Sequence, residues 1–367
     1  QCPTLVLASF FSINTLSRPC FTKNWSLAGA RFTIRVTSRG GILYQSIVVS
    51  DLHLSDVEHL DPDRPLWKLY KRRELFFDHE IINCIKYVEN SYSGPTELIL
   101  NGDIFDFDNV VELPDSPEYH INWLAKLRGL GTEEWMSSFK ANCIIRDHPE
   151  FFRELGEFLD RGNRIVLIAG NHDLELCWPS VREQIYAAMN LEDGSQEKDE
   201  LVFCDWFYVS EKDTYVSHGH QYDAFCVVRD PIYPFIQIRG KPQVRLPFGE
   251  VAERYILNGM GYFNPHATSN FIMGLGEYVR FFFKYMLRTQ PFLIWSWFWG
   301  AMVTLFLTFS HFIRPPMKDP LKIEERTAEV AKASQVSPDV VRKLEAVSVA
   351  SACSNPIRII RELWLDR

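Results

Sequence analysis

Four short apolar runs in the first two thirds of the chain have the length and composition of buried β-strands. They are residues 44–49 (YQSIVV), 97–100 (ELIL), 164–169 (RIVLIA) and 214–217 (TYVS). Residues 71–90 and 147–162 lie between the first three runs and have helical patterns. Strands and helices therefore alternate, which indicates an α/β fold with a buried sheet. We assign this core to residues 42–230.

Residues 1–41 differ from the core in composition. No acidic residue precedes Asp51, and Arg and Lys are scattered among many Ser and Thr. This composition resembles a transit peptide. The chain also begins with Gln1 and not Met, so the alternative is a segment that is not native. We treat residues 1–41 as an N-terminal extension, with a candidate first strand at residues 31–37.

The region 231–350 is predicted to be a helical insertion. It contains an uncharged, aromatic run at residues 291–313, long enough for about 30 Å of helix. Trp295, Trp297 and Trp299 cluster near one end, as at a membrane interface. Membrane contact through this run is the favoured interpretation, and a buried pair of helices is the alternative. The run does not decide whether it spans the membrane, re-enters it or lies flat.

Residues 351–367 end in RIIRELWLDR, which is typical of the start of a further helix without a stop signal. A truncated chain is one explanation for this ending.

Composition and charge narrow the classes of function. The chain has 46% hydrophobic and 23% charged residues, as globular proteins do. Its net charge of −8 disfavours nucleic acid as a partner, because such proteins usually present a basic face. The eight cysteines form no CxxC pair, which argues against a thiolate zinc site and favours buried thiols in a reducing compartment.

Clusters of Asp, Asn and His follow each of the four predicted strands. Because ligands bind at the carboxyl ends of strands in open α/β sheets, these clusters are expected to converge on one place. The clusters are Asp51–His53 (DLH), Gly102–Asp106 (GDIFD), Gly170–Asp173 (GNHD) and His218–Asp223 (HGHQYD).

Each cluster offers groups suited to binding metal and phosphate. Asp51 and His53 can donate an oxygen and a nitrogen to one cation. Asp103 has two oxygens and can bridge two cations, although a helix N-cap is the alternative for this residue alone. Asn171 offers a neutral carbonyl. His172 can donate a proton or a hydrogen bond to a phosphoryl oxygen, with Asp173 orienting it.

The string DLHL…GDIFD…GNHD…HGH resembles the calcineurin-like metallophosphoesterase family over roughly residues 44–226. The resemblance implies a two-sheet αββα sandwich and a site for two divalent ions, with Mn²⁺ expected first and Fe²⁺ or Zn²⁺ as alternatives. The metal ligands that it implies are Asp51, His53, Asp103, Asn171 and His218. His172 and Asp173 would be catalytic, and His220, Asp106 and Asp223 are further candidates for metal or substrate.

The sequence departs from this family at its last motif, G-H-x-H, which is missing. Three explanations stay open. The chain is truncated before the motif, or His218 and His220 act as the terminal pair, or the protein is a degenerate and inactive member. His218 and His220 can act together because residues i and i+2 share one face of a strand.

Within the family, the spacing and the HG-x-x-x-D pattern after His218 resemble UDP-2,3-diacylglucosamine pyrophosphatases. That likeness implies a phosphorylated or lipid-linked small-molecule substrate and a membrane-associated enzyme with its active site on the cytoplasmic side. The alternatives are a phosphodiesterase or nuclease acting on nucleotides, and a catalytically dead, membrane-attached binding or scaffold protein.

Overall fold

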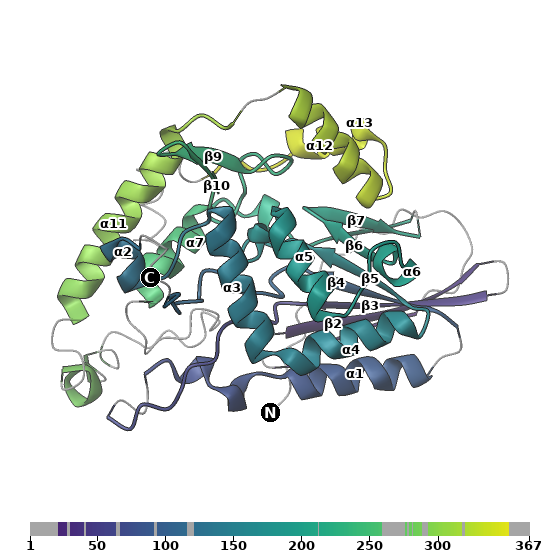
Figure 1. Ribbon diagram of the computed structural model, residues 1–367, viewed down its shortest axis with the longest axis horizontal. Helices are drawn as coiled ribbons and strands as arrows, with labels where there is room; N and C mark the ends of the chain where they lie inside the picture. The colour runs from purple at the N-terminus through teal and green to yellow at the C-terminus, as the bar shows by residue number, and fades with distance from the viewer. Residues whose placement is uncertain are drawn as a thin grey trace.

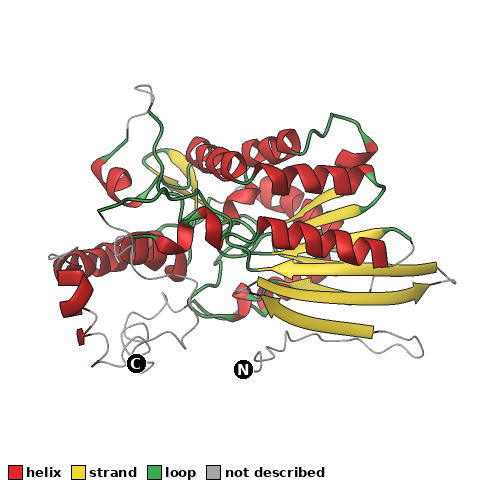
Figure 2. Cartoon of the chain, turned by 90° about the horizontal axis from the view of Figure 1, so that it is seen from below, coloured by secondary structure: helices red, strands yellow, loops and turns green. Residues whose placement is uncertain are grey.

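The computed structural model arranges strands, helices and loops around one central sheet (Figures 1 and 2). It describes residues 21–27, 30–39, 42–63, 67–91, 94–115, 121–211, 213–258, 276, 279–280, 282–287, 293–317 and 320–351.

The central sheet has six strands in the order β1-β2-β3-β4-β5-β6. Strands β3 to β6 are parallel, whereas β1 and β2 pair antiparallel at one edge. The strands are β1 (Phe21–Leu27), β2 (Ala30–Arg39), β3 (Ile42–Ser50), β4 (Thr96–Asn101), β5 (Arg164–Ile168) and β6 (Leu201–Cys204). All four predicted strands are thus confirmed. Three of them are β3, β4 and β5, and the fourth, at residues 214–217, is β8 of a second sheet. Strand β6 was not predicted.

The N-terminal strands correct the division of the chain at residue 41. Strand β2 pairs with β3 along its whole length, from Arg31 opposite Ser50 to Arg39 opposite Ile42. Residues 32–36 alternate apolar with polar types, which is the pattern of a half-buried strand. Residues 21–27 and 30–39 therefore belong to the sheet and not to an extension, and the candidate strand at 31–37 lies within β2. Residues 1–20 are outside the described part.

One face of the sheet is covered by a layer of helices. Side chains that alternate along each strand point to this face, including Ile47, Leu98 and Ile165, and they join one buried cluster with residues of the helices. The helices are α1 (Asp78–Ser91), α3 (Glu134–Asp147), α4 (Pro149–Asp160) and α5 (Pro179–Ala188). The helices predicted at 71–90 and 147–162 correspond to α1 and α4.

The opposite face carries a second, smaller sheet. Strands β7 (Phe207–Ser210) and β8 (Thr214–Ser217) pair antiparallel. Tyr208 of β7 and Val216 of β8 pack on Ile99 and Val166 of the central sheet. The helices α12 (Pro320–Ala333) and α13 (Pro338–Ala346) then cover Phe207 through Val330 and Val341, as Figure 1 shows beside β7. The layers follow the expected order of helix, sheet, sheet and helix, with two strands in the second sheet.

The remaining described segments are short or belong to the region 231–350. The short ones are η1 (Leu69–Lys71), η2 (Arg73–Leu75), α2 (Trp123–Arg128), η3 (Leu174–Cys177), α6 (Gln196–Asp199) and η4 (His220–Tyr222). The region 231–350 contains β9 (Phe235–Ile238), β10 (Lys241–Val244), α7 (Phe248–Ala252), η5 (Glu253–Leu257), η7 (Phe282–Met286) and α11 (Leu293–Ile313), besides α12 and α13. It is therefore not wholly helical, because β9 and β10 form a hairpin. The further helix expected at 351–367 lies outside the described residues, except for residue 351.

Helix α11 corresponds to the apolar run and lies against α7 and η5. Its Gly300 permits this approach, because an added Cβ would lie only 2.6 Å from the carbonyl oxygen of Tyr255. Thr304 and Thr308 of α11 are buried, whereas large apolar side chains on its other side are exposed. The exposed ones are Trp295, Phe298, Met302, Leu305, Phe306, Phe309 and Ile313. Among the helices that the structure describes, none combines the length and apolarity needed to cross a membrane.

Packing between the two sheets is expected to contribute strongly to stability. Ile99 of β4 is fully buried on the face of the central sheet that packs against β7 and β8. Ile99→Ala should therefore lower the free energy of unfolding by about 2–5 kcal/mol. Leu60→Ala, at a side chain that is 62% exposed, serves as the control and should change it by less than about 0.5 kcal/mol. Urea unfolding measures both values. Equal losses in the two variants would contradict the two-sheet packing.

Candidate active site

The loops that follow β3 and β4 run side by side and bring two of the four clusters together. The N–H of Asp51 donates to the carbonyl of Gly102 at 3.2 Å, and the N–H of His53 donates to the carbonyl of Asp103 at 2.9 Å. Asp51, His53 and Asp103 all have positive φ, at 61°, 51° and 53°. Such backbone strain in non-glycine residues is concentrated at functional sites.

Two glycines allow the third and fourth clusters to approach Asp103. A Cβ on Gly170 would lie 2.6 Å from the backbone nitrogen of Asp103. A Cβ on Gly102, which has a φ of 74°, would lie 2.5 Å from Cγ of His218. Side chains at these two positions would separate the loops, so glycine is required for the convergence.

Asp103 lies at the centre of the assembled cluster. Its Oδ2 is 2.9 Å from Nε2 of His218, and its Oδ1 accepts a hydrogen bond from the backbone N–H of His172 at 3.0 Å. Burial acts to raise the pKa of Asp103, but the imidazoles of His218 and His172 outweigh it and hold the pKa well below its usual range. In turn, burial lowers and Asp103 raises the pKa of His218, with a net rise to about 9.

Among the described residues, three groups of side chains could each hold a metal ion. Within each group, the ligand atoms all lie within 4.8 Å of one another. They are Asp51 with Asp103 and His218, His53 with Asp103 and His172, and Asp106 with His172 and Glu253. Asp103 belongs to two of these groups, as expected of a bridging carboxylate. The carboxylate oxygens and imidazole nitrogens fit a divalent transition metal.

Asp173 supports the site through the backbone and not through the side chain of His172. Its Oδ1 accepts the N–H of Gly170 at 2.5 Å, and its Oδ2 accepts the N–H of Ile104 at 2.9 Å. These bonds tie the loop after β5 to the loop after β4. Burial, and then the charge of Asp103, raise the pKa of Asp173 to about 7. Asp173 was expected to orient the His172 side chain, but it instead fixes the backbone of the loop that carries His172.

Carboxylates instead surround the imidazole of His172. Its Nδ1 is 3.3 Å from Oε2 of Glu253 and 3.7 Å from Oδ1 of Asp106. Its Nε2 is 4.0 Å from Oε1 of Glu250. Asp106, a candidate from the sequence, thus lies beside the predicted catalytic histidine.

Glu250 and Glu253 were not predicted from the sequence as site residues. Both are buried, and they reach the site from α7 and η5, far along the chain from the four clusters. Glu250 Oε1 accepts a hydrogen bond from Nδ2 of Asn171 at 2.5 Å. The available signal was an E-x-x-E spacing, which places two acids on one face of a helix. That spacing is common on solvent-exposed helices, and no recognisable motif surrounds it here, so it does not by itself indicate a functional site.

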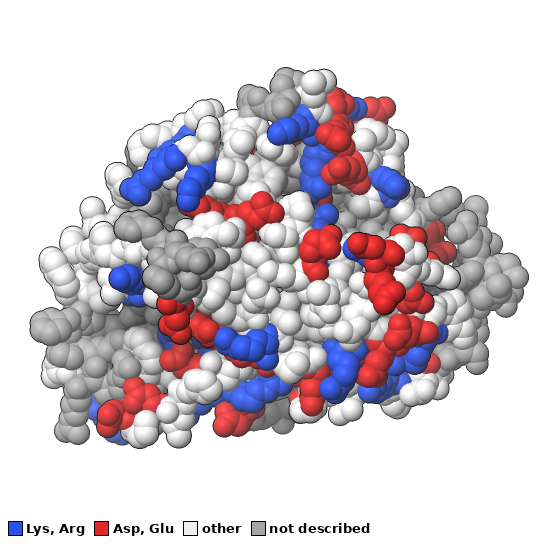
Figure 3. Space-filling model, viewed as in Figure 1, with Lys and Arg blue, Asp and Glu red and all other residues white. Residues whose placement is uncertain are grey.

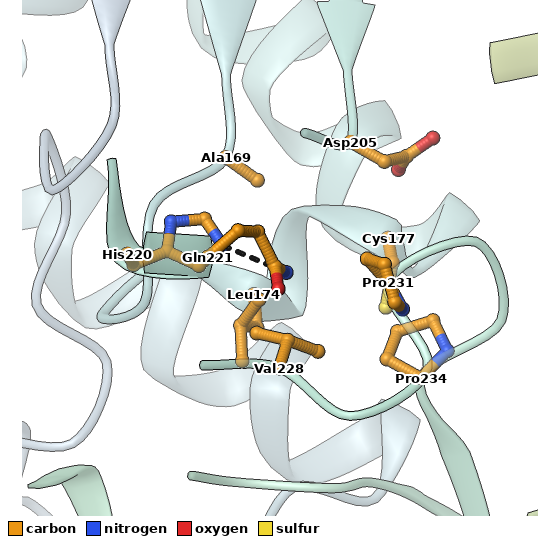
Figure 4. A pocket seen from close by; sticks show the side chains of 9 residues that line it. All are labelled: Ala169, Leu174, Cys177, Asp205, His220, Gln221, Val228, Pro231 and Pro234. Atoms are coloured by element: carbon orange, nitrogen blue, oxygen red, sulfur yellow. Dashed lines mark hydrogen bonds between the residues drawn. The ribbon is translucent and has the colours of Figure 1, made fainter. Parts of the chain in front are cut away.

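His220 and Asp223 lie apart from the three groups of ligands. His220 is buried and lines a small pocket with Gln221, Cys177 and Val228 (Figure 4). Burial lowers its pKa to about 3. Its ring centre is 5.8 Å from that of His218, but it joins none of the ligand groups found in the described chain.

Asp223 is exposed and accepts a hydrogen bond from the N–H of Phe225 at 2.7 Å. This local bond is typical of a turn. The structure therefore does not bring these two candidates into the cluster around Asp103.

A sequence model of the family described as calcineurin-like phosphoesterase matches residues 45–247. The chain belongs to this family. No curated protein and no solved structure matches the chain. Membership makes this metallophosphoesterase a metal-dependent phosphoester hydrolase that uses divalent ions. The groups around Asp103 supply donors that fit such ions.

The close approach at Gly170 can be tested by substitution. Gly170→Ala should displace Asp103, because the added Cβ would lie 2.6 Å from its backbone nitrogen. We expect weaker metal binding and at least a roughly 10-fold loss of phosphoesterase activity. Gly276→Ala, where a Cβ meets nothing within 4 Å, is the matched control. Full metal binding by Gly170→Ala would contradict the geometry.

Proposed function

We propose that this metallophosphoesterase uses two divalent metal ions to hydrolyse a phosphoric ester or anhydride in a phosphorylated small molecule. The observation that carries the proposal is the convergence of Asp51, His53, Asp103, His172 and His218 at the carboxyl ends of the strands. Four sequence clusters, separated by up to about half of the chain, meet around one carboxylate.

The side chains divide between metal binding and catalysis. In this proposal Asp51 and His53 bind the first ion, and Asn171 and His218 bind the second. Asp103 lies between the two sets, with one oxygen toward His218 and the other beside His172. When bound, the ions make water nucleophilic near neutral pH and stabilise negative charge on phosphoryl oxygens.

His172 is placed to assist at the phosphoryl group. Its backbone N–H is held by Asp103, and its ring packs edge-on against the ring of His53 at 4.9 Å between centroids. The ring nitrogens can donate a hydrogen bond to a phosphoryl oxygen as its negative charge grows. Asp173 keeps the loop carrying His172 against the loop carrying Asp103.

A lipid-linked nucleotide is the proposed substrate, as in the pyrophosphatases that the sequence resembles. Support comes from α11, which exposes a row of large apolar side chains and packs against the helix that carries Glu250. Exposed apolar patches of this kind mark sites of interaction with proteins or membranes. We propose that α11 rests on a membrane surface, with the active site on the cytoplasmic side, and that Mn²⁺ is the preferred ion.

Nucleic acid is a weaker candidate substrate. On the face shown in Figure 3, Lys and Arg are interspersed with Asp and Glu and form no extended basic patch. The net charge is −8. Binding to nucleic acid without sequence specificity depends on many basic contacts with phosphate.

Substitution of a metal ligand and substitution of a catalytic residue should have different effects on metal binding and on activity. Asp103→Asn should abolish Mn²⁺-dependent hydrolysis of a generic phosphodiester, because a neutral amide replaces the shared carboxylate. His172→Ala should retain the bound metal and lower kcat by about 10²–10⁴-fold. Elemental analysis and steady-state kinetics on the same samples measure both effects.

Treatment of the wild-type chain with a chelator should remove activity, and added Mn²⁺ should restore it. Full activity of Asp103→Asn, or activity that survives complete metal removal, would refute the proposed function. Metal binding without hydrolysis of any phosphoester or anhydride would instead favour a catalytically dead binding protein.

Membrane contact through α11 predicts binding to vesicles. The double variant Trp295→Ser/Phe306→Ser removes two side chains that are 68% and 72% exposed. Its affinity for phosphatidylglycerol-containing vesicles should fall roughly 10-fold or more, because burial of one such side chain contributes about 1.5–3 kcal/mol. Tyr87→Ser on α1, where the side chain is 74% exposed, is the control. Co-sedimentation that is equal for both variants would count against this contact.

A further inference from the structure

Helix α7 inserts a buried carboxylate into the site from outside the four sequence clusters. The side chain of Glu250 is 99% buried, with a relative exposure of 1%. Burying an ionised carboxylate is costly unless hydrogen bonds or a cation compensate for the lost water. The partners of Glu250 therefore indicate what the site is built to hold.

The two oxygens of Glu250 have different surroundings. Oε1 accepts the hydrogen bond from Nδ2 of Asn171 at 2.5 Å and is 4.0 Å from Nε2 of His172. Oε2 is buried and has no hydrogen-bond partner among the described residues. Glu250 belongs to none of the three groups of ligand atoms. Its Oε1 nevertheless lies next to Asn171, a predicted metal ligand, and its Oε2 could accept a cation.

Several other buried carboxyl groups surround Glu250 and favour the binding of a cation beside it. Asp106, Asp108 and Glu253 are also buried nearby, and Glu253 shares a potential ligand group with Asp106 and His172. The guanidinium of Arg254 lies 3.9 Å from Asp108 and donates to the carbonyl of Gly129. Buried carboxylates in this number need positive charge close by, and a divalent ion supplies it.

The position of Glu250 is fixed by packing on both sides of α7. Phe248 packs on Phe225 with 5.8 Å between ring centroids, and the N–H of Gly249 donates to the carbonyl of Phe225 at 3.1 Å. Val251 is buried in the main core, and α11 lies against the helix. A side chain held on a rigid, packed element is suited to metal binding.

We propose that Glu250 is a direct ligand of the divalent ion that Asn171 binds. The Asn171 amide now donates its Nδ2 to Glu250. The nitrogen and oxygen of an amide can exchange places, and with its carbonyl oxygen turned toward Glu250 the two residues would each offer an oxygen to one ion. Oxygen donors of this kind suit Mn²⁺. The inference rests on the proposed function, because it names a further ligand of the same metal site.

The test measures Mn²⁺ binding directly and does not depend on activity. Free Mn²⁺ is counted by electron paramagnetic resonance during titration of the wild-type chain, Glu250→Gln and Glu154→Gln. Glu154 is a buried glutamate of α4 that pairs with Lys86 and Arg161, which makes it a matched control. We expect two Mn²⁺ ions in the wild type and in Glu154→Gln. In Glu250→Gln we expect the affinity for one ion to fall at least about 10-fold.

Thermal melting separates loss of a ligand from loss of the fold. Without metal, Glu250→Gln should melt at the wild-type temperature or above it, because an uncompensated buried charge is removed. Added Mn²⁺ should stabilise this variant less than the wild type. Glu250→Asp keeps the charge but withdraws both oxygens, and it is titrated in parallel in case Glu250→Gln does not fold. It should also bind one ion more weakly.

The outcomes distinguish this inference from the proposed function. Two Mn²⁺ ions bound with unchanged affinity by both Glu250 variants would overturn the role of Glu250 and leave the metal-dependent function standing. A wild-type chain that binds no Mn²⁺ would overturn both.

Discussion

Backbone hydrogen bonds between the loops after β3 and β4 position the candidate active site of this protein. They hold Asp51 and His53 against Gly102 and Asp103, in backbone conformations that non-glycine residues rarely adopt. The strain is tolerated because the parallel strands behind the loops are buried on both faces and cannot shift independently. Asp103 is thereby presented to His218 and to the loop that carries His172.

The assembled site gathers four buried carboxyl groups around one imidazole. Around His172 lie Asp103, Asp106, Glu250 and Glu253, all buried. Desolvation of carboxylates opposes folding unless a positive charge accompanies it. Divalent ions, which the family uses, would offset this cost while supplying the chemistry. In the proposed function, stability and activity of the site would depend on the same ions.

The region 231–350 supplies residues of the candidate active site and also an exposed apolar surface. Its α7 and η5 carry Glu250 and Glu253 inward, and α11 packs on them through the close contact at Gly300. The same α11 exposes aromatic side chains to the outside. One packed unit thus joins the candidate metal site to an apolar surface.

The sequence by itself determined the family, the strands β3 to β5 and the residues around Asp103. These features are local, because apolar runs define buried strands and the polar residues after them must lie at the carboxyl ends. Only the tertiary structure decided that β1 and β2 join the sheet, that Asp173 binds backbone N–H groups, and that His220 lines a separate pocket. It also brought Glu250 to Asn171, which lies 79 residues away along the chain. Such contacts depend on the packing of whole elements against one another, and no spacing within a single segment encodes them.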